Sequence, residues 1–349
     1  MLRLLLAALP LLLRPIAASP VRTSAAALSA SAAALASVAV EPSGETADEA
    51  ELARNEVLAS LKTEEAALEA QLTEVQARKK KLLASRRLRI GIVGFGPFGQ
   101  FLAKTFVINN DVVAASRSDH SARAFELGAS AYVSLSDPAA LFAEQLDVLL
   151  ISVSIVSFER TLAALAPHME GRDVLVVDVL SVKDFPKTLF EQHVPPSCDI
   201  LATHPMFGPE SGGGPNGWRG LNFVYDAVRI ADRPEARDRL ERFLSVWEEQ
   251  GCRMVEMSAG QHDAHAASSQ FVTHLTGRML GNLELAATPI DTKGFQSLLG
   301  VVENTIADSW DLFYGLYKYN EANAQHIIAA VRDSLTELVR QLEDTDAKT

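Results

Sequence analysis

Short apolar runs alternate with amphipathic stretches between residues 87 and 257. A run that is apolar throughout is typical of a strand buried on both faces of a parallel sheet, and the stretches between the runs have helical spacing. This alternation predicts an α/β fold, a Rossmann-type doubly wound sheet whose ligand crevice lies at the carboxyl ends of the strands. The predicted strands occupy residues 90–93, 112–115, 147–153, 173–179, 200–203, 223–230 and 252–257.

The pattern changes on both sides of this region. From residue 258 to 345 the apolar positions follow helical spacing, which predicts a C-terminal all-helical domain. In residues 46–86, apolar residues recur every seven positions at Leu61, Leu68, Val75 and Leu82. That spacing predicts one long helix, and both a short coiled coil and a solvated linker helix fit it.

Residues 1–45 differ again in composition. The first 40 residues contain Arg3, Arg14 and Arg22 but no acidic residue, and the apolar run at 4–13 is too short to cross a bilayer. An apolar run followed by Ala- and Ser-rich sequence is typical of a targeting leader. We expect it to direct the protein to the plastid (chloroplast stroma) and to be removed there, which leaves no membrane partner for the mature form. The alternative is an N-terminus that carries no targeting signal.

The charge balance argues against some ligands. The 349 residues carry 32 Lys and Arg against 44 Asp and Glu, a net charge of −12, whereas nucleic-acid binding needs a basic surface. Cys198 and Cys252 have neither metal-ligand nor disulfide spacing. His262, Asp263 and His265 lie close together, but we read them as a helix start and predict no metal site.

The stretch RLRIGIVGFGPFGQFLAKTF, residues 87–106, places Gly94, Gly96 and Gly99 between a predicted strand and a predicted helix. In a dinucleotide site the first glycine forms the tight turn, the second lets the backbone approach the pyrophosphate, and the third lets helix and strand pack closely. Amides at the helix start then face the phosphates, and Pro97 suits the first helical turn. The alternative is a structural glycine turn in another α/β protein.

The end of the second predicted strand indicates which dinucleotide binds. NAD enzymes have an acidic residue there, about 20 residues after the glycine motif, that binds the ribose hydroxyls. This chain instead has Ser116, Arg117 and Ser118, with no acid before Asp119. A guanidinium flanked by hydroxyls favours a 2′-phosphate, so NADP is the predicted cofactor, with an ordinary surface arginine as the alternative. The predicted cofactor-binding residues are Gly94, Phe95, Gly96, Phe98, Gly99, Ser116, Arg117, Ser118 and Ser154.

Two later strand ends carry candidate catalytic groups. Ser181 follows the predicted strand at 173–179, and His204 follows the strand at 200–203. A Rossmann-type sheet presents such positions to a bound nicotinamide. There a histidine can take a proton from an alcohol as hydride leaves, and a serine can hydrogen-bond beside it. A structural hydrogen bond is the alternative for His204, because the chain has eight histidines.

A set of motifs resembles the arogenate dehydrogenases of plants and algae, which with the prephenate dehydrogenases form the TyrA family. The motifs are GFGPFGQFLAKTF, SRSDHS, LSVK, THPMFGPESG, HD-x-HAA-x-SQF-x-TH-x-x-GR and TPI-x-TKG, and the similarity runs from about residue 87 to 320. The resemblance implies an NADP-dependent oxidoreductase that converts L-arogenate to L-tyrosine, with His204 as the catalytic base and Ser181 beside it. It also implies a homodimer built by the helical domain, and a substrate contact from His274.

One departure from the family concerns the substrate carboxylate. Many bacterial relatives bind it with an arginine in a Gly-Phe-Arg-type segment, but residues 294–296 here read GFQ. The candidates for that contact are Arg278, one helical turn from His274, and Lys293. Arogenate carries an ammonium where prephenate has a keto group, and Asp308 is predicted to select the ammonium.

Three alternative functions remain open. The first is a prephenate dehydrogenase on the same fold, and the second is a non-catalytic regulatory protein that senses NADP. The third is another small-substrate reductase with a helical dimer domain, such as the imine or β-hydroxyacid reductases. Intact Ser181 and His204 argue against the sensor. The THPMFGPESG segment and the helix with the HD…H pattern argue against the other reductases.

Overall fold

The structure, a computed structural model, describes residues 47–84, 86–214 and 216–347. The predicted leader, residues 1–45, lies outside the described residues. The chain divides into two compact units, Met1–Lys79 and Lys80–Thr349.

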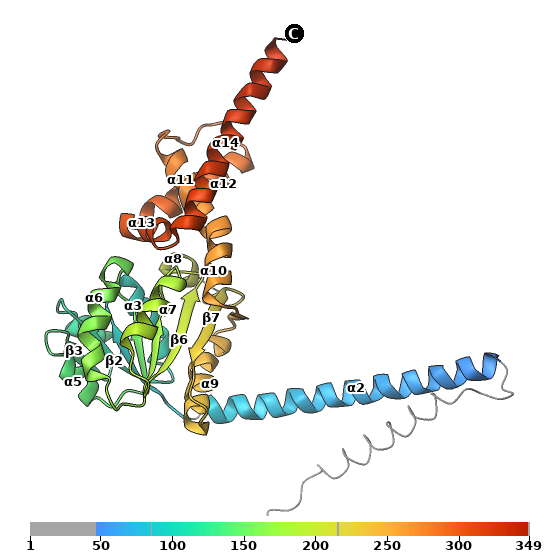
Figure 1. Ribbon diagram of the computed structural model, residues 1–349, viewed down its shortest axis with the longest axis vertical. Helices are drawn as coiled ribbons and strands as arrows, with labels where there is room; N and C mark the ends of the chain where they lie inside the picture. The colour runs from blue at the N-terminus through green and yellow to red at the C-terminus, as the bar shows by residue number, and fades with distance from the viewer. Residues whose placement is uncertain (1–46, 85, 215, 348–349) are drawn as a thin grey trace, which may run out of the picture. The chain divides into compact units, whose positions relative to one another are not determined.

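The described part of the first unit is a single helix, α2 (Ala47–Ala84), which continues into the second unit (Figure 1). Its sequence is rich in Ala, Leu, Glu and Lys, whose high helix propensity favours one long helix. The residues of the heptad repeat are exposed at every position, namely Leu61, Leu68, Val75 and Leu82. Pairing of α2 with another helix therefore stays a prediction.

The second unit contains a sheet of eight strands in the order β3-β2-β1-β4-β5-β6-β7-β8. All neighbouring strands are parallel except β6 and β7, which are antiparallel. The doubly wound α/β prediction is therefore confirmed. The strands are β1 (Arg89–Val93), β2 (Asp111–Ser116), β3 (Ala131–Ser134), β4 (Val148–Ile151), β5 (Leu175–Asp178), β6 (Asp199–Pro205), β7 (Asn222–Arg229) and β8 (Arg253–Glu256).

Two features of the sheet are not evident in the sequence pattern. β3 has only four residues, AYVS, and three of them are partly or fully exposed at the sheet edge, so it lacks the apolar run of a central strand. The antiparallel direction of β7 depends on the path of the chain between β6 and β7, which no local pattern encodes.

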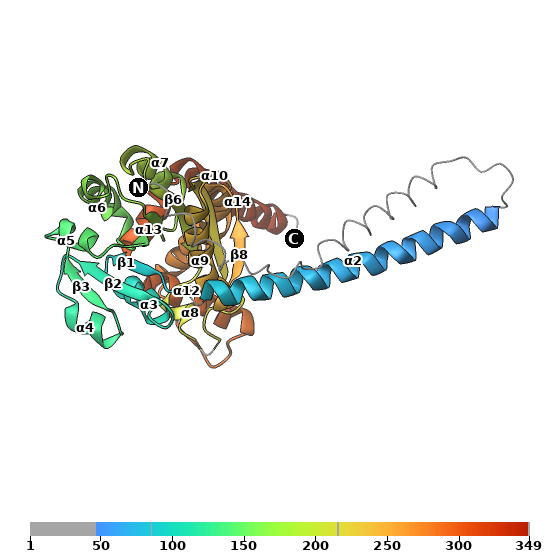
Figure 2. The same ribbon diagram turned by 90° about the horizontal axis from the view of Figure 1, so that it is seen from below.

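Helices cover both faces of the sheet, and apolar side chains fill the space beneath them (Figures 1 and 2). On one face, under α5, α6 and α7, Phe158 and Phe190 meet edge to face. On the other, under α3, α4 and α9, Phe106, Phe243 and Trp247 pack together. Burial of each such side chain contributes about 1.5–3 kcal/mol. The helices are α3 (Pro97–Phe106), α4 (Ser121–Glu126), α5 (Pro138–Ala143), α6 (Ile155–Leu165), η1 (Ala166–His168), α7 (Asp184–His193), α8 (Pro209–Gly212) and α9 (Pro234–Glu249).

Beyond β8 the described chain is helical. A capping box between Ser258 and Gln261 starts α10. Gly277 and Gly281 let α11 approach α12, because added Cβ atoms would press against Thr305 and Ile306. The elements are α10 (Ala259–Ala266), the π-helical turn η2 (Ala267–Phe271), α11 (Val272–Gly281), α12 (Lys293–Ala307), α13 (Trp310–Lys318) and α14 (Glu321–Asp346).

The helical region packs against the sheet region within one compact unit. The rings of Phe185 in α7 and Tyr319 are 4.0 Å apart between centroids. Gly315 of α13 lies against Ile155, the first residue of α6. Because α6 follows the carboxyl end of β4, α13 lies near the edge of the sheet where a ligand crevice is expected. Among the described residues, no helix is both long and apolar enough to span a membrane.

Candidate functional site

The glycine loop has the geometry that a pyrophosphate requires. Gly94 ends β1 with φ +95°, and a side chain there would collide with the Ser152 carbonyl. A side chain at Gly99 would collide with the Gly94 carbonyl, so only glycine lets α3 pack this closely on β1. Gly96 caps α3 without a side-chain bond, and the space next to its Cα is open. The backbone amides at the start of α3 are therefore accessible to an anion.

The other predicted residues near this loop have different environments. Phe95 is fully buried in the core, so only its backbone can contact a dinucleotide. Phe98 is partly buried and packs on Phe101 at 5.9 Å between centroids. Ser154 is exposed at the N-cap of α6. Next to Gly94, the buried hydroxyl of Ser152 has no hydrogen-bond partner, which makes it a further candidate that the motif did not indicate.

The end of β2 exposes Arg117 and Ser118, whereas Ser116 is buried. Arg117 is exposed and forms no ion pair with any other described residue. The Ser116 hydroxyl donates to the Ser118 carbonyl at 2.8 Å, which fixes the turn around Arg117. The Asp119 carboxylate accepts from the Ser121 amide at 2.9 Å, and hydrogen bonds from Ser121 lower its pKa. This acid therefore accepts the amide of the first residue of α4, whose N-cap is His120.

The two predicted catalytic residues follow neighbouring parallel strands. β5 and β6 pair with Asp178 beside Ala202, so their carboxyl ends meet at one edge of the sheet. Ser181, partly buried, follows β5, and His204 lies near the end of β6 with 3% exposure. Burial, followed by the nearby His262 and Lys183, holds the pKa of His204 well below its ordinary value. The imidazole is therefore neutral near neutral pH.

His204 is joined to His262 and Asp263, for which the sequence pattern indicated only a helix start. His204 Nδ1 lies 2.8 Å from His262 Nε2, and His262 Nδ1 lies 2.8 Å from Asp263 Oδ1. The Asp263 carboxylate also accepts the backbone amides of Lys183 at 2.7 Å and Asp184 at 3.0 Å. The adjacent HD pair was visible in the sequence, but nothing local places it against β6.

A buried ion pair supports the same strand ends. Lys183 Nζ pairs with the Asp178 carboxylate and donates to the Thr203 carbonyl, beside His204. The side chains are 1% and 0% exposed. Burial lowers the pKa of Lys183, and the attraction to Asp178 opposes that shift.

The structure brings together three of the predicted substrate residues. His274 Nε2 on α11 is 3.7 Å from Asp308 Oδ2, which follows α12. Burial lowers the pKa of His274, Asp308 opposes that shift, and Arg278 adds to it. Arg278 donates to the Asp308 carbonyl at 2.7 Å and lies over the Trp310 and Phe313 rings at 5.5 and 5.1 Å.

Polar atoms without partners lie along this helix face. Among the described residues, Gln270 Oε1, His274 Nδ1 and Arg278 Nε are buried without a hydrogen bond. Buried polar atoms without a partner are costly unless a ligand or water satisfies them. Gln270 belongs to the π-helical turn η2, a distortion frequent at functional sites. These atoms therefore indicate a polar ligand site.

Lys293 is not part of this group. It is exposed at the first residue of α12. At 1.5 Å per residue, it lies roughly 18 Å along the helix from Thr305, which packs against Gly277 next to Arg278. Within one chain, Lys293 and Arg278 cannot bind the same carboxylate.

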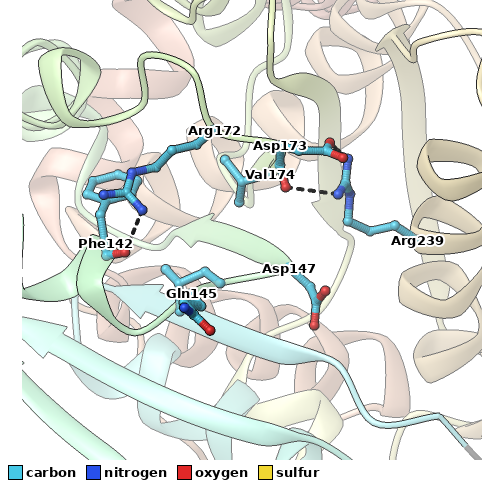
Figure 3. Close-up of a pocket in the computed structure, with 8 residues that line it drawn as sticks. Phe142, Gln145, Asp147, Arg172, Asp173, Val174 and Arg239 are labelled. Atoms are coloured by element: carbon cyan, nitrogen blue, oxygen red, sulfur yellow. Dashed lines mark hydrogen bonds and ion pairs between the residues drawn. The ribbon is translucent and has the colours of Figure 1, made fainter.

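A pocket elsewhere in the molecule is distinct from this site. Figure 3 shows it between Phe142, Gln145, Asp147, Arg172, Asp173 and Arg239. Asp147 lies one residue before β4 and Asp173 two residues before β5, so the pocket lies at the amino ends of the strands. Arg239 is engaged there by Asp173 and Asp199. A Rossmann-type sheet binds its ligand at the opposite edge, so this pocket is not the dinucleotide site. Within the described residues, no group of three or more His, Cys, Asp or Glu side chains has an arrangement that could hold a metal ion.

Comparisons with known proteins agree with these motifs. The family model for the nucleotide-binding domain of prephenate dehydrogenase matches residues 106–256, and the TYRAAT1-like C-terminal domain model matches residues 279–349. Arogenate dehydrogenase 1, chloroplastic, of Arabidopsis thaliana is 53% identical over 235 residues, covering 67% of this chain and 36% of that protein. Arogenate dehydrogenase 2, chloroplastic, of the same plant is 48% identical over 243 residues, covering 69% of this chain and 66% of that protein.

The chain thus aligns with about a third of the length of the first relative and just under two thirds of the second. The crystal structure of Synechocystis arogenate dehydrogenase superposes with a TM-score of 0.55 at 18% identity, covering 74% of this chain and 93% of that one. That similarity shows the fold. Taken together, the glycine loop, the fold and the plant relatives show that the chain belongs to the prephenate and arogenate dehydrogenase family.

Proposed function

We propose that the protein is an NADP-dependent arogenate dehydrogenase, which oxidises and decarboxylates L-arogenate to L-tyrosine. The observation that carries this proposal is the neutral, buried His204 at the carboxyl end of β6, on the sheet edge that also holds the glycine loop. The names of the plant relatives support arogenate as the substrate.

The chemistry follows from the properties of His204. The glycine loop and the start of α3 would hold the dinucleotide, with Ser152 and Ser154 nearby. When bound, the nicotinamide would supply the hydride acceptor for C4 of the substrate ring. His204 accepts the proton of the C4 hydroxyl, and Ser181 orients that hydroxyl by a hydrogen bond. The bond to the ring carboxylate then breaks and carbon dioxide leaves. The electron pair of that bond passes through the ring to the C4 oxygen, which takes a proton back from His204 to give the aromatic phenol.

The choice of NADP rests on the end of β2. Arg117, exposed and free of ion pairs with other described residues, would bind the 2′-phosphate, with the hydroxyls of Ser116 and Ser118 beside it. A charge-assisted bond of this kind contributes about 1.5–3 kcal/mol. Asp119, the first acid after β2, accepts the first amide of α4 and would not compete for the ribose hydroxyls.

The choice of arogenate rests on Asp308. Its side chain is 45% exposed and approaches His274, so it offers a carboxylate to an ammonium while it remains accessible to a ligand. Arg278 Nε, buried and unpartnered, would bind the substrate carboxylate. Prephenate dehydrogenase activity is the second candidate, because that substrate shares the ring, the hydroxyl and the ring carboxylate.

A homodimer and a plastid location complete the proposal. α14 exposes Leu335, Leu338, Val339 and Leu342, which share one face of the helix because they are three, four and seven residues apart. We infer that a second copy covers this face. Both plant relatives are named chloroplastic, which supports a plastid location.

The experiment that tests the function is steady-state kinetics of the purified protein with arogenate and with prephenate, each with NADP and with NAD. The proposal expects the highest kcat/KM for arogenate with NADP. Higher kcat/KM with prephenate would establish the second candidate, and binding of NADP without turnover of either substrate would leave only a sensor. Light scattering during size-exclusion chromatography measures the oligomeric state.

A further inference from the structure

Three buried side chains form a continuous hydrogen-bonded chain that ends at His204. Asp263, His262 and His204 are 2%, 3% and 3% exposed. The distances are 2.8 Å from Asp263 Oδ1 to His262 Nδ1, and 2.8 Å from His262 Nε2 to His204 Nδ1. Among the described residues, nothing hydrogen-bonds to His204 Nε2. The chain therefore engages one ring nitrogen of His204 and leaves the other for a ligand.

The protons in this chain can be assigned one after another. A carboxylate can only accept, so the hydrogen between Asp263 and His262 is on His262 Nδ1. A neutral imidazole carries one N–H, so His262 Nε2 is an acceptor. The hydrogen between the two rings is then on His204 Nδ1, and His204 Nε2 holds a lone pair.

We propose, building on the function above, that Asp263 and His262 are positioning residues that hold His204 in the Nδ1–H tautomer, so that its Nε2 can accept the hydroxyl proton of the substrate. With the other tautomer, Nε2–H would point at the substrate, and the catalytic base would be absent. The carboxylate acts on the reaction through two imidazoles, without touching substrate or cofactor.

Backbone contacts explain why Asp263 can set the direction of the chain. Its two oxygens accept the amides of Lys183 and Asp184 at the start of α7, where the helix dipole favours a negative charge. Asn320 Nδ2 donates to the Asp263 carbonyl at 2.7 Å and fixes the backbone. The carboxylate is thus held as an acceptor toward His262.

The environment of this hydrogen-bonded chain also favours a neutral His204 in the resting protein. Burial disfavours a proton on the resting His204, and the charge of Lys183 adds to this effect. Asp178 pairs with Lys183 on the β5 side, and Asp184 lies on the α7 side of His262. When His204 becomes an imidazolium during the reaction, its Nδ1–H can strengthen the bond to His262, and the Asp263 charge stabilises the cation.

Asp263→Asn is the direct test of the tautomer. Asp263 Oδ1 accepts from both Lys183 and His262, and Oδ2 accepts from Asp184. Asparagine has one oxygen for these two positions. Either orientation removes the negative charge that stabilises the imidazolium, and the orientation with NH₂ toward His262 Nδ1 also places the His262 hydrogen on Nε2 and reverses the His204 tautomer. By analogy with the carboxylate of a serine protease triad, kcat should fall by roughly 10²–10⁴-fold. The KM values for NADP and arogenate should change less than about threefold, because neither ligand touches Asp263.

Two further comparisons separate positioning from a structural role. Asp184→Asn removes the neighbouring carboxylate but leaves the chain intact, and its kcat should stay near that of the wild type. His262→Gln places Oε1 where Nε2 lies and can still accept from His204, whereas His262→Leu cannot. Glutamine should therefore retain at least tenfold more kcat than leucine. Equal losses in both His262 variants, or wild-type kcat in Asp263→Asn, would overturn the proposal.

A direct measurement of the tautomer does not depend on turnover. In protein labelled with ¹⁵N-histidine, the His204 signals, assigned by their loss in His204→Asn, should show Nδ1–H and an unprotonated Nε2 at neutral pH. An Nε2–H tautomer in the wild type would overturn the proposal, even if arogenate dehydrogenase activity is established. Conversely, an Nδ1–H tautomer in a protein without that activity would refute the proposed function and leave the hydrogen-bond assignment valid.

Discussion

Replacing Lys183 by methionine tests the buried ion pair behind the catalytic strand ends. Methionine nearly preserves the volume and length of the lysine stem but removes the ammonium. The Asp178 carboxylate, 0% exposed, would lose its cation and keep only the amides of Leu180 and Thr203, at 2.9 and 3.3 Å. The Thr203 carbonyl would lose its Nζ donor as well.

The expected cost follows from that burial. Removing one partner of a buried ion pair costs about 3–5 kcal/mol, because it leaves an uncompensated buried charge. For a domain of this size each kcal/mol corresponds to about 2–4 °C, so the melting temperature should fall by roughly 6–20 °C. In Asp178→Asn/Lys183→Met both charges are absent, and the asparagine oxygen can still accept from Leu180. At least half of the lost stability should therefore return.

The assay is equilibrium unfolding in urea, followed by tryptophan fluorescence, since Trp247 is fully buried in the core. The wild type, the two single variants and the double variant form a cycle from which the coupling free energy is obtained. A free energy of unfolding of Lys183→Met within about 1 kcal/mol of the wild-type value would contradict the prediction, because an exposed ion pair contributes about that much. A double variant that is less stable than Lys183→Met would contradict it as well.

Three other predictions test the cofactor, the substrate and the catalytic histidine. Arg117→Ala should raise KM for NADP by roughly 10–100-fold and leave KM for NAD unchanged, because only NADP has the 2′-phosphate; Arg123→Ala, one helix further on, is the matched control. Asp308→Asn should lower kcat/KM for arogenate about tenfold or more relative to prephenate. Unchanged selectivity would show that Asp308 does not select the ammonium. The pKa of His204 is lowered on folding from about 6.5, so the unfolded chain binds the extra proton first. The contribution of His204 to the free energy of unfolding should therefore be constant above that value and fall as pH drops through it, by up to about 1.4 kcal/mol per pH unit. His204→Asn should flatten that dependence, measured by urea unfolding between about pH 8 and 5, and a slope identical to the wild type would contradict it.

Local sequence determined much of the sheet region. The glycine spacing of residues 94–99 predicts a tight turn that only glycine can make, and the structure has Gly94 at positive φ with no room for a side chain at Gly94 or Gly99. The apolar runs predict the central strands, because a strand buried on both faces has few polar positions. The heptad spacing likewise predicts α2.

Tertiary structure alone decided the surroundings of His204. His204 and His262 are 58 residues apart, and Lys183 and Asp263 are 80 apart, so no local pattern reports that they touch. The HD pair at residues 262–263 looks like an ordinary helix start until α10 packs against the ends of β5 and β6. Periodicity encodes which faces are buried, whereas the partners of a buried polar group depend on how distant elements meet.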